Sequence, residues 1–176
     1  DEVIKAAIKA GVEILIVPAV DQGKFTEKSE EKIFIDFIEK RAQSFVDHRL
    51  KIAIESDYEP KKLKKFIDNF GSEYFGINYD MGNSASLGYE SSKEIELYGD
   101  RIINVHIKDR KLNGTTVPLG LGNTDMKYVF NALKPEYYLG NWIFQTARSH
   151  NGEDVNIMKT HIEYISNLAD WIIVNE

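Results

Sequence analysis

The chain has 176 residues, of which 43% are hydrophobic and 28% charged, and these proportions are usual for one globular domain. Its 22 Lys and Arg residues are outnumbered by 28 Asp and Glu residues, and the net charge of −6 argues against sequence-independent binding to nucleic acid, which needs a basic surface. There is no cysteine, no apolar run long enough to cross a membrane and no visible signal peptide, so we expect a cytoplasmic protein without disulfides, thiolate metal sites, nucleic-acid partners or membrane partners.

Helical and strand patterns alternate along the chain. In order, they are a helix over 1–10 stopped by Gly11, a strand over 12–20 that should be buried on both faces, a long helix over 26–49, a strand over 51–54, a helix opened by Pro60, a strand over 74–79, a helix over 91–98, a strand over 102–105, a helix capped by Asp125, a strand over 142–144, and a helix from about Asp154. Polar loops are expected around Gly82 and over 108–124.

This alternation predicts an α/β protein with a parallel sheet. Five strands are too few to close a barrel of eight. An open sheet with the flavodoxin-like strand order is therefore an alternative that the pattern alone leaves open.

Four strands end in side chains that carry an oxygen or an imidazole nitrogen: Glu55, Asp80, His106 and Gln145. Because the carboxyl ends of parallel strands meet at one edge, we expect these side chains to lie together. Two carboxylates and an imidazole suit Mn²⁺, Mg²⁺, Co²⁺ or Zn²⁺. Such a metal could polarise a sugar carbonyl and stabilise an ene-diolate, while a carboxylate moves the proton on the adjacent carbon.

Each of these residues also has a structural explanation. Glu55 could cap the helix that follows its strand, Asp80 could belong to a turn with Gly82 and Asn83, and a single His after an apolar run is often a hydrogen-bonded structural residue. The remaining histidines, at positions 48, 150 and 161, are assigned to surface or helix faces.

Three strings resemble one known family. They are NYDMGN at 78–83, VHIKD at 105–109 and VPLGLGNTD at 117–125. Together they are similar to the sugar-phosphate isomerase/epimerase family, most closely to its L-ribulose/L-xylulose 5-phosphate 3-epimerase (hexulose-6-phosphate isomerase) type. The resemblance implies a xylose-isomerase-like (β/α)8 TIM barrel, of which this chain would hold about the last five βα units.

The resemblance also implies roles for individual residues. Glu55, Asp80 and His106 would be three of four metal ligands, and Glu55 would be one of two acid/base carboxylates. Asn83 lies where related ketose epimerases have a substrate-contacting His. Lys108 would touch substrate oxygens or phosphate, although a Lys after a strand is usually only solvated.

Gln145 departs from the family pattern. The family has a Glu here that is both the fourth metal ligand and the second acid/base group. An amide oxygen can bind a metal but cannot take a proton, so metal affinity should fall and a one-base isomerisation remains. Arg148 nearby is suited to a carboxylate or phosphate. A non-catalytic sugar-binding protein, or a divergent lyase on the same scaffold, is therefore the alternative function.

Length is the second departure. Residues 1–176 would be the C-terminal portion of a barrel truncated at its N-terminus, and the two open sheet edges would favour a homo-oligomer or a longer native protein. The expected partner is a small-molecule sugar or sugar phosphate. An endonuclease-IV-like DNA-repair enzyme shares the barrel, but that family needs more histidine ligands and a basic face.

Overall fold

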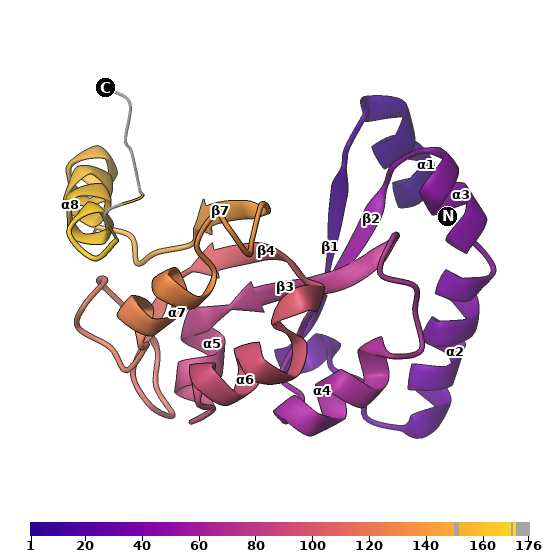
Figure 1. Cartoon of the computed structure of the whole chain (residues 1–176), viewed down its shortest axis with the longest axis horizontal. Helices are drawn as coiled ribbons and strands as arrows, with labels where there is room; N and C mark the ends of the chain where they lie inside the picture. The colour runs from indigo at the N-terminus through magenta and orange to yellow at the C-terminus, as the bar shows by residue number, and fades with distance from the viewer. Residues whose placement is uncertain (150–151, 170, 172–176) are drawn as a thin grey trace. The chain divides into compact units, whose positions relative to one another are not determined.

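Five strands form one sheet in the computed structural model, which describes residues 1–149, 152–169 and 171 (Figure 1). The strand order β1-β2-β3-β4-β7 follows the chain, so consecutive strands of the sheet are neighbours. The pairs β1–β2, β2–β3 and β4–β7 are parallel. A sequential parallel order is that of a (β/α) barrel and differs from the flavodoxin-like order, so the barrel-type prediction is confirmed.

The chain divides into two compact units, and the boundary falls within β3. The first unit is Asp1–Asn78 with Arg101–Ile103, and the second is Tyr79–Asp100 with Asn104–Glu176. The elements that begin in the first unit are α1 (Glu2–Ala10), β1 (Ile14–Ala19), the 3-10 turn η1 (Asp21–Gly23), α2 (Lys28–Glu39), α3 (Ala42–Asp47), β2 (Lys51–Ser56), α4 (Pro60–Ile67) and β3 (Phe75–Asp80).

The elements of the second unit follow β3. They are α5 (Met81–Ser86), α6 (Ser91–Tyr98), the 3-10 turn η2 (Gly99–Arg101), β4 (Ile102–Ile107), the short strands β5 (Asp109–Arg110) and β6 (Thr116–Val117), α7 (Met126–Ala132), β7 (Asn141–Phe144) and α8 (Asp154–Ser166). Of these, only Arg101–Ile103, the end of η2 and the start of β4, belongs to the first unit. No helix among the described residues is long and apolar enough to span a membrane.

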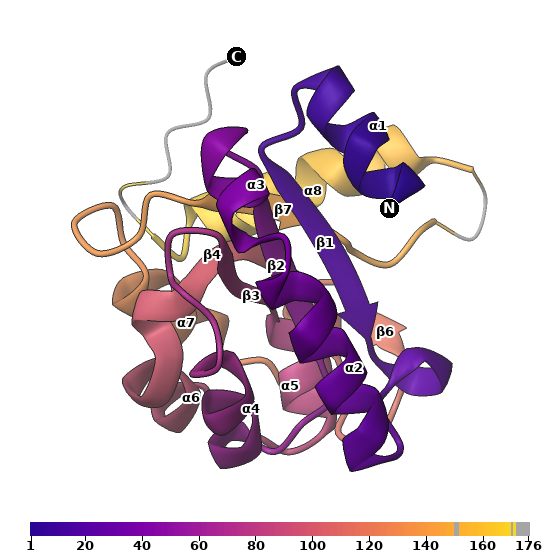
Figure 2. The ribbon, with the colours of Figure 1, turned by 90° about the vertical axis from the view of Figure 1, so that its right-hand side faces the viewer.

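Aromatic packing forms the core of the first unit. Phe34 on α2 packs against Phe66 on α4 and against Phe75 on β3, with ring centroids 6.0 and 6.3 Å apart. The ring of Phe70 stacks on Phe75 at 3.9 Å. These contacts hold α2 and α4 against the sheet, and Figure 2 shows this unit from the side on which α2 lies.

The strand over 12–20 was predicted to be buried on both faces, and this was wrong. β1 is an edge strand that pairs only with β2, and only Ala19 within it is buried. The four residues Ile14 to Val17 are all half-buried, so neither face of β1 is fully covered. Pro18 is exposed and has no N–H to offer to a further strand, which suits an edge.

The single helix predicted over 26–49 is two helices, α2 and α3. The break falls at Lys40 and Arg41, where the Arg41 N–H bonds the Ile38 carbonyl instead of continuing the α-helical ladder. The Arg41 guanidinium donates to the Phe37 carbonyl at 2.8 Å and lies 3.7 Å from the centre of its ring. The side chain thus satisfies the carbonyl that the break leaves unpaired.

Two expected loops contain regular structure. The segment around Gly82 forms helix α5, because Asp80 caps its first turn, and residues 108–124 contain the two-stranded antiparallel sheet β5–β6. The Asp125 cap was predicted correctly, since its Oδ1 accepts the Tyr128 N–H at 3.1 Å.

Candidate metal and substrate site

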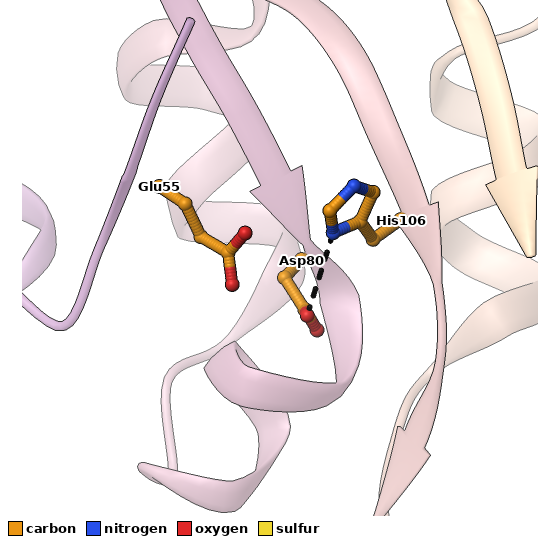
Figure 3. A group of neighbouring side chains, drawn as sticks. All are labelled: Glu55, Asp80 and His106. Atoms are coloured by element: carbon orange, nitrogen blue, oxygen red, sulfur yellow. Dashed lines mark ion pairs between the residues drawn. The ribbon is translucent and has the colours of Figure 1, made fainter. Parts of the chain in front are cut away.

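Asp80 ends β3 and begins α5, and its side chain is completely buried. Its Oδ1 accepts the Asn83 N–H at 2.8 Å, so one carboxylate oxygen caps the helix. The other oxygen, Oδ2, lies 3.8 Å from His106 Nδ1 at the end of β4 (Figure 3). The turn explanation for Asp80 is therefore correct for Oδ1. The second oxygen, Oδ2, faces His106 instead.

Glu55 is oriented by Asn78. Both side chains are buried, and Asn78 Nδ2 donates to Glu55 Oε2 at 2.8 Å. Asn78 and Asp80 are two residues apart on β3, so they face the same side of the sheet. One strand therefore carries both Asp80 and the amide that holds Glu55.

The ligand atoms of Glu55, Asp80 and His106 all lie within 4.8 Å of one another (Figure 3). All three residues are buried, and their donors are two carboxylate oxygens and an imidazole nitrogen. This is a donor set that divalent Mn, Mg, Co or Zn accepts. Of the four strand-end residues predicted to lie together, these three do so, and their donor chemistry fits a metal.

Lys108 connects Asp80 to Gln145. Its ammonium nitrogen donates to Asp80 Oδ2 at 3.2 Å and to Gln145 Oε1 at 2.8 Å. The Lys108 side chain is only 15% exposed, which is unusual for a lysine and shows that it is packed into the site. The simple solvated role considered from the sequence is wrong for this residue.

Asn83 is held by two contacts in the second unit. Its backbone N–H donates to Asp80 Oδ1, and its side-chain Oδ1 accepts a hydrogen bond from Arg110 Nη1 at 2.8 Å. Arg110 is itself fixed, because it also donates to the Gly114 carbonyl through two nitrogens. The orientation of Asn83 is therefore set by its neighbours.

Asp109 organises the loop that follows β6. Its buried carboxylate accepts the N–H groups of Gly120 and Gly122 on Oδ2 and that of Thr124 on Oδ1, at 2.8 to 3.1 Å. A Cβ on Gly122 would lie 2.0 Å from Asp109 Oδ1, so only glycine allows this close approach. The VPLGLGNTD string is thereby wrapped around one carboxylate.

A cleft of about 660 Å³ lies next to Lys108 and Gln145 in the second unit. Its walls come from the strand end of β7, the segment after β5 and the start of α8. The described lining residues are Lys108, Thr115, Thr116, Val117, Pro118, Gln145, Thr146, Ala147, Arg148 and Ile157. Three predicted site residues, Lys108, Gln145 and Arg148, thus face one cavity.

A further buried carboxylate lies on α6. Glu94 on α6 is 2% exposed and accepts hydrogen bonds from the hydroxyl groups of Tyr79, Ser84 and Tyr98 at 2.7 to 2.9 Å. Burial raises the pKa of Glu94, and the three donors oppose that rise. Glu94 thus ties β3, α5 and α6 together.

His161 was assigned to a surface or helix face. It does lie on α8, but it is 4% exposed. Burial lowers its pKa, while a hydrogen bond to the Ala147 backbone opposes that change. His161 therefore supports the segment that carries Gln145 and Arg148. His48 is exposed as predicted, and His150 lies outside the described residues.

Three residues that support the site were not predicted from the sequence: Asn78, Asp109 and Arg110. Asn78 had a visible signal, because alternate residues of a strand share a face and Asn78 precedes Asp80 by two. Asp109 lay inside a quoted string without an assigned partner. Arg110 had no signal, since its contact with Asn83 depends on the β5–β6 turn.

The model of the xylose isomerase-like TIM barrel family matches residues 1–168. Two proteins named "Putative L-ribulose-5-phosphate 3-epimerase SgbU" are similar in sequence. The one from Escherichia coli (strain K12) is 30% identical over 91 residues, covering 48% of this chain and 32% of that protein. The one from Haemophilus influenzae is 24% identical over 168 residues, covering 87% and 58%. The chain therefore spans about one third to three fifths of the length of these relatives.

Solved structures share the fold at low identity. The xylose isomerase domain protein from Planctomyces limnophilus superposes with a TM-score of 0.77 and 17% identity, over 95% of this chain and 63% of that chain. The IOLI protein, solved with a bound zinc atom, gives a TM-score of 0.76 and 14% identity over 99% and 69%.

Proposed function

Because the chain belongs to the xylose isomerase-like TIM barrel family, we propose that it is a metal-dependent isomerase or epimerase of a sugar or sugar phosphate, working in cytoplasmic carbohydrate metabolism. The observation that carries this proposal is the buried group Glu55, Asp80 and His106, whose ligand atoms lie within 4.8 Å of one another. The names of the epimerase relatives support the same reaction class.

In this proposal Glu55, Asp80 and His106 hold a divalent ion, and the amide oxygen of Gln145 is the fourth ligand. Gln145 Oε1 already accepts from Lys108, but an amide oxygen has two lone pairs and can serve both partners. When bound, the ion supplies Lewis-acid polarisation of a sugar carbonyl. Manganese, magnesium, cobalt and zinc all suit the donor set.

Glu55 is the proposed catalytic base. Its carboxylate would take the proton from the carbon next to the carbonyl, the bond electrons would pass into the substrate as an ene-diolate, and the proton would return to the neighbouring carbon, while the hydroxyl proton passes from one substrate oxygen to the other. With both proton transfers, atoms and charge balance with one carboxylate base. Asn78 positions the carboxylate through its 2.8 Å hydrogen bond. Asn83 and Lys108 are proposed to contact substrate oxygens, and Arg148 its anionic group.

An epimerisation that uses two opposed acid/base groups is less well supported than an isomerisation that uses one base. Gln145 stands at the second acid/base position, and an amide cannot accept or release the proton at neutral pH. Gln145 is therefore proposed to position the substrate. The same observation favours the second candidate, a non-catalytic sugar-binding protein or divergent lyase on this scaffold.

Incorporation of solvent deuterium into ketoses and ketose phosphates, measured by mass spectrometry with added Mn²⁺, tests the proposal. We expect exchange at a carbon next to the carbonyl with the natural chain, none with Glu55→Gln, and unchanged exchange with the exposed control Glu96→Gln. Exchange only in Gln145→Glu would favour the non-catalytic alternative. Absence of exchange in both the natural chain and Gln145→Glu would contradict the proposed reaction.

A further inference from the structure

The ammonium group of Lys108 contacts two of the atoms that the proposed metal ion needs. Its Nζ donates to Asp80 Oδ2 at 3.2 Å and to Gln145 Oε1 at 2.8 Å. Asp80 Oδ2 is the oxygen that faces His106 Nδ1, because Oδ1 accepts the Asn83 N–H and caps helix α5. Lys108 and a divalent ion would therefore use the same carboxylate oxygen, and all of these residues belong to the second unit.

The contact between Asp80 and Lys108 is shielded from water. The Asp80 side chain is completely buried and the Lys108 side chain is 15% exposed, whereas the partners of an ordinary surface ion pair are both solvated. Low access of water strengthens the attraction between the two charges, and a buried carboxylate that lost its cation would be costly. Lys108 therefore stabilises the Asp80 carboxylate in its buried position.

The stem of Lys108 is fixed where it passes helix α5. A Cβ on Gly82 would lie 2.8 Å from Lys108 Cγ and 3.0 Å from Lys108 Cβ, so only glycine at position 82 lets the lysine pass this close to the helix. The backbone of Lys108 is held as well, because its carbonyl accepts the Thr124 hydroxyl at 3.3 Å. The fold thus directs the ammonium group towards Asp80.

A divalent ion bound to Asp80 Oδ2 would lie close to this ammonium group. The oxygen has lone pairs for both partners, but two cations at such a short separation repel each other strongly inside a protein. The ammonium group has space to leave, because Lys108 also lines the cleft of about 660 Å³ beside Gln145. Rotation about the terminal bonds of its flexible side chain would carry the charge from Asp80 into that cleft.

From these contacts we propose that Lys108 is a built-in counter-cation of the metal site. It neutralises Asp80, competes with the divalent ion for Oδ2, and turns into the cleft when the ion binds. This inference rests on the proposed function and adds an order of events to it, in which ion binding makes the Lys108 ammonium available to substrate oxygens. Lys108 is then a positioning residue that sets the metal affinity of this chain.

Two measurements on Lys108→Met separate competition from an ordinary structural role. Isothermal titration should show that the variant binds Mn²⁺ about tenfold or more tightly than the natural chain, because the repelling charge is gone. Urea unfolding in EDTA should show a lower midpoint for the variant, because Asp80 stays buried without its cation. Lys127→Met removes the same charge from an exposed position on α7 and should change neither value.

Amine labelling tests the displacement in the natural chain. Acetylation by an N-hydroxysuccinimide ester, followed by peptide mass spectrometry, should become several-fold faster at Lys108 when Mn²⁺ saturates the protein, because the ammonium group has moved into the cleft. The rate at exposed Lys127 should stay constant. An unchanged or slower rate at Lys108 with bound Mn²⁺ would overturn the inference.

Failure of the counter-cation and failure of the proposed function give different results. If Mn²⁺ binds to Lys108→Met with the same affinity as to the natural chain, or more weakly, the counter-cation is overturned and the metal site stands. If Mn²⁺ binds to neither protein, the metal site is refuted and the counter-cation with it. Binding of Mn²⁺ to Lys108→Met alone would support the counter-cation, because removal of the lysine charge would then be what permits the ion to bind.

Discussion

At the scale of single residues, Asn78 is the group on which the geometry of Glu55 depends. We predict that Asn78→Ala weakens Mn²⁺ binding by about tenfold or more, because a carboxylate ligand that loses its supporting hydrogen bond is no longer held toward the metal. Isothermal titration with Mn²⁺ measures this. Asn131→Ala, at an exposed position on α7, is the matched control. Equal affinity in the natural chain and Asn78→Ala would show that Asn78 does not orient a ligand.

Glu94 gives a second prediction at this scale. Burial raises its pKa in the folded protein above the ordinary value of 4.5, so the folded state binds its proton more tightly than the unfolded state. Such a group contributes stability that is complete below the unfolded pKa and is lost as the pH rises through the folded pKa.

We therefore expect the natural chain to lose stability relative to Glu94→Gln as the pH rises above about 4.5, with a slope of at most about 1.4 kcal/mol per pH unit. Urea unfolding across this pH range provides the measurement. Parallel stability profiles for the two proteins would mean that Glu94 does not titrate with a raised pKa.

The proposed metal ligands could be predicted from the sequence, but the residues that orient them could not. Glu55, Asp80 and His106 could be predicted because strand ends meet at one edge of a parallel sheet. The donor to Glu55, the double contact of Lys108 and the orientation of Gln145 depend on side-chain rotamers that no periodicity encodes. Their roles in binding and catalysis stay predictions until they are measured.

At the scale of elements, the loop from Pro118 to Thr124 depends on Asp109. We predict that Asp109→Asn destabilises the protein by about 1 to 3 kcal/mol, because an amide has one oxygen and an NH2 group where three N–H donors now converge. Thermal unfolding measures the loss. Asp100→Asn, at an exposed site, should change stability by about 0.5 kcal/mol or less. Similar losses in both variants would contradict the role of Asp109.

Sequence periodicity predicted the five strands and their order of appearance, since apolar runs and helix caps are local signals. It missed helix α5, whose formation depends on the Asp80 cap, and the β5–β6 pairing, whose contacts join residues several positions apart. It also joined α2 to α3, because the break at Arg41 arises from a side-chain contact with Phe37 and not from Gly or Pro.

At the scale of the whole molecule, β1 and β7 are the edge strands of the described sheet. Pro18 interrupts the outer edge of β1, whereas β7 presents Ile143 with 45% of its surface exposed. We expect β7 to pair with a strand from a second copy of this chain. Sedimentation velocity should show concentration-dependent association that Ile143→Lys reduces and that Val155→Lys, exposed on α8, does not. A monomer at all concentrations would contradict self-association through this edge.

The barrel assignment came from motif resemblance and not from the element count, because five βα units fit both an open sheet and part of a barrel. The sequential strand order and the family match decided between them. No composition or periodicity signal could have done so, since strand order depends on contacts between distant segments.

The proposed reaction depends first on the binding of one divalent metal ion by Glu55, Asp80 and His106. Titration of chelator-treated protein with Mn²⁺, followed by electron paramagnetic resonance, tests it most directly. We predict one bound ion per chain, loss of that binding in Asp80→Asn, and retention in Asp100→Asn. No bound Mn²⁺, and none of Zn²⁺, Co²⁺ or Mg²⁺ in parallel calorimetric titrations, would contradict the metal site and with it the proposed reaction.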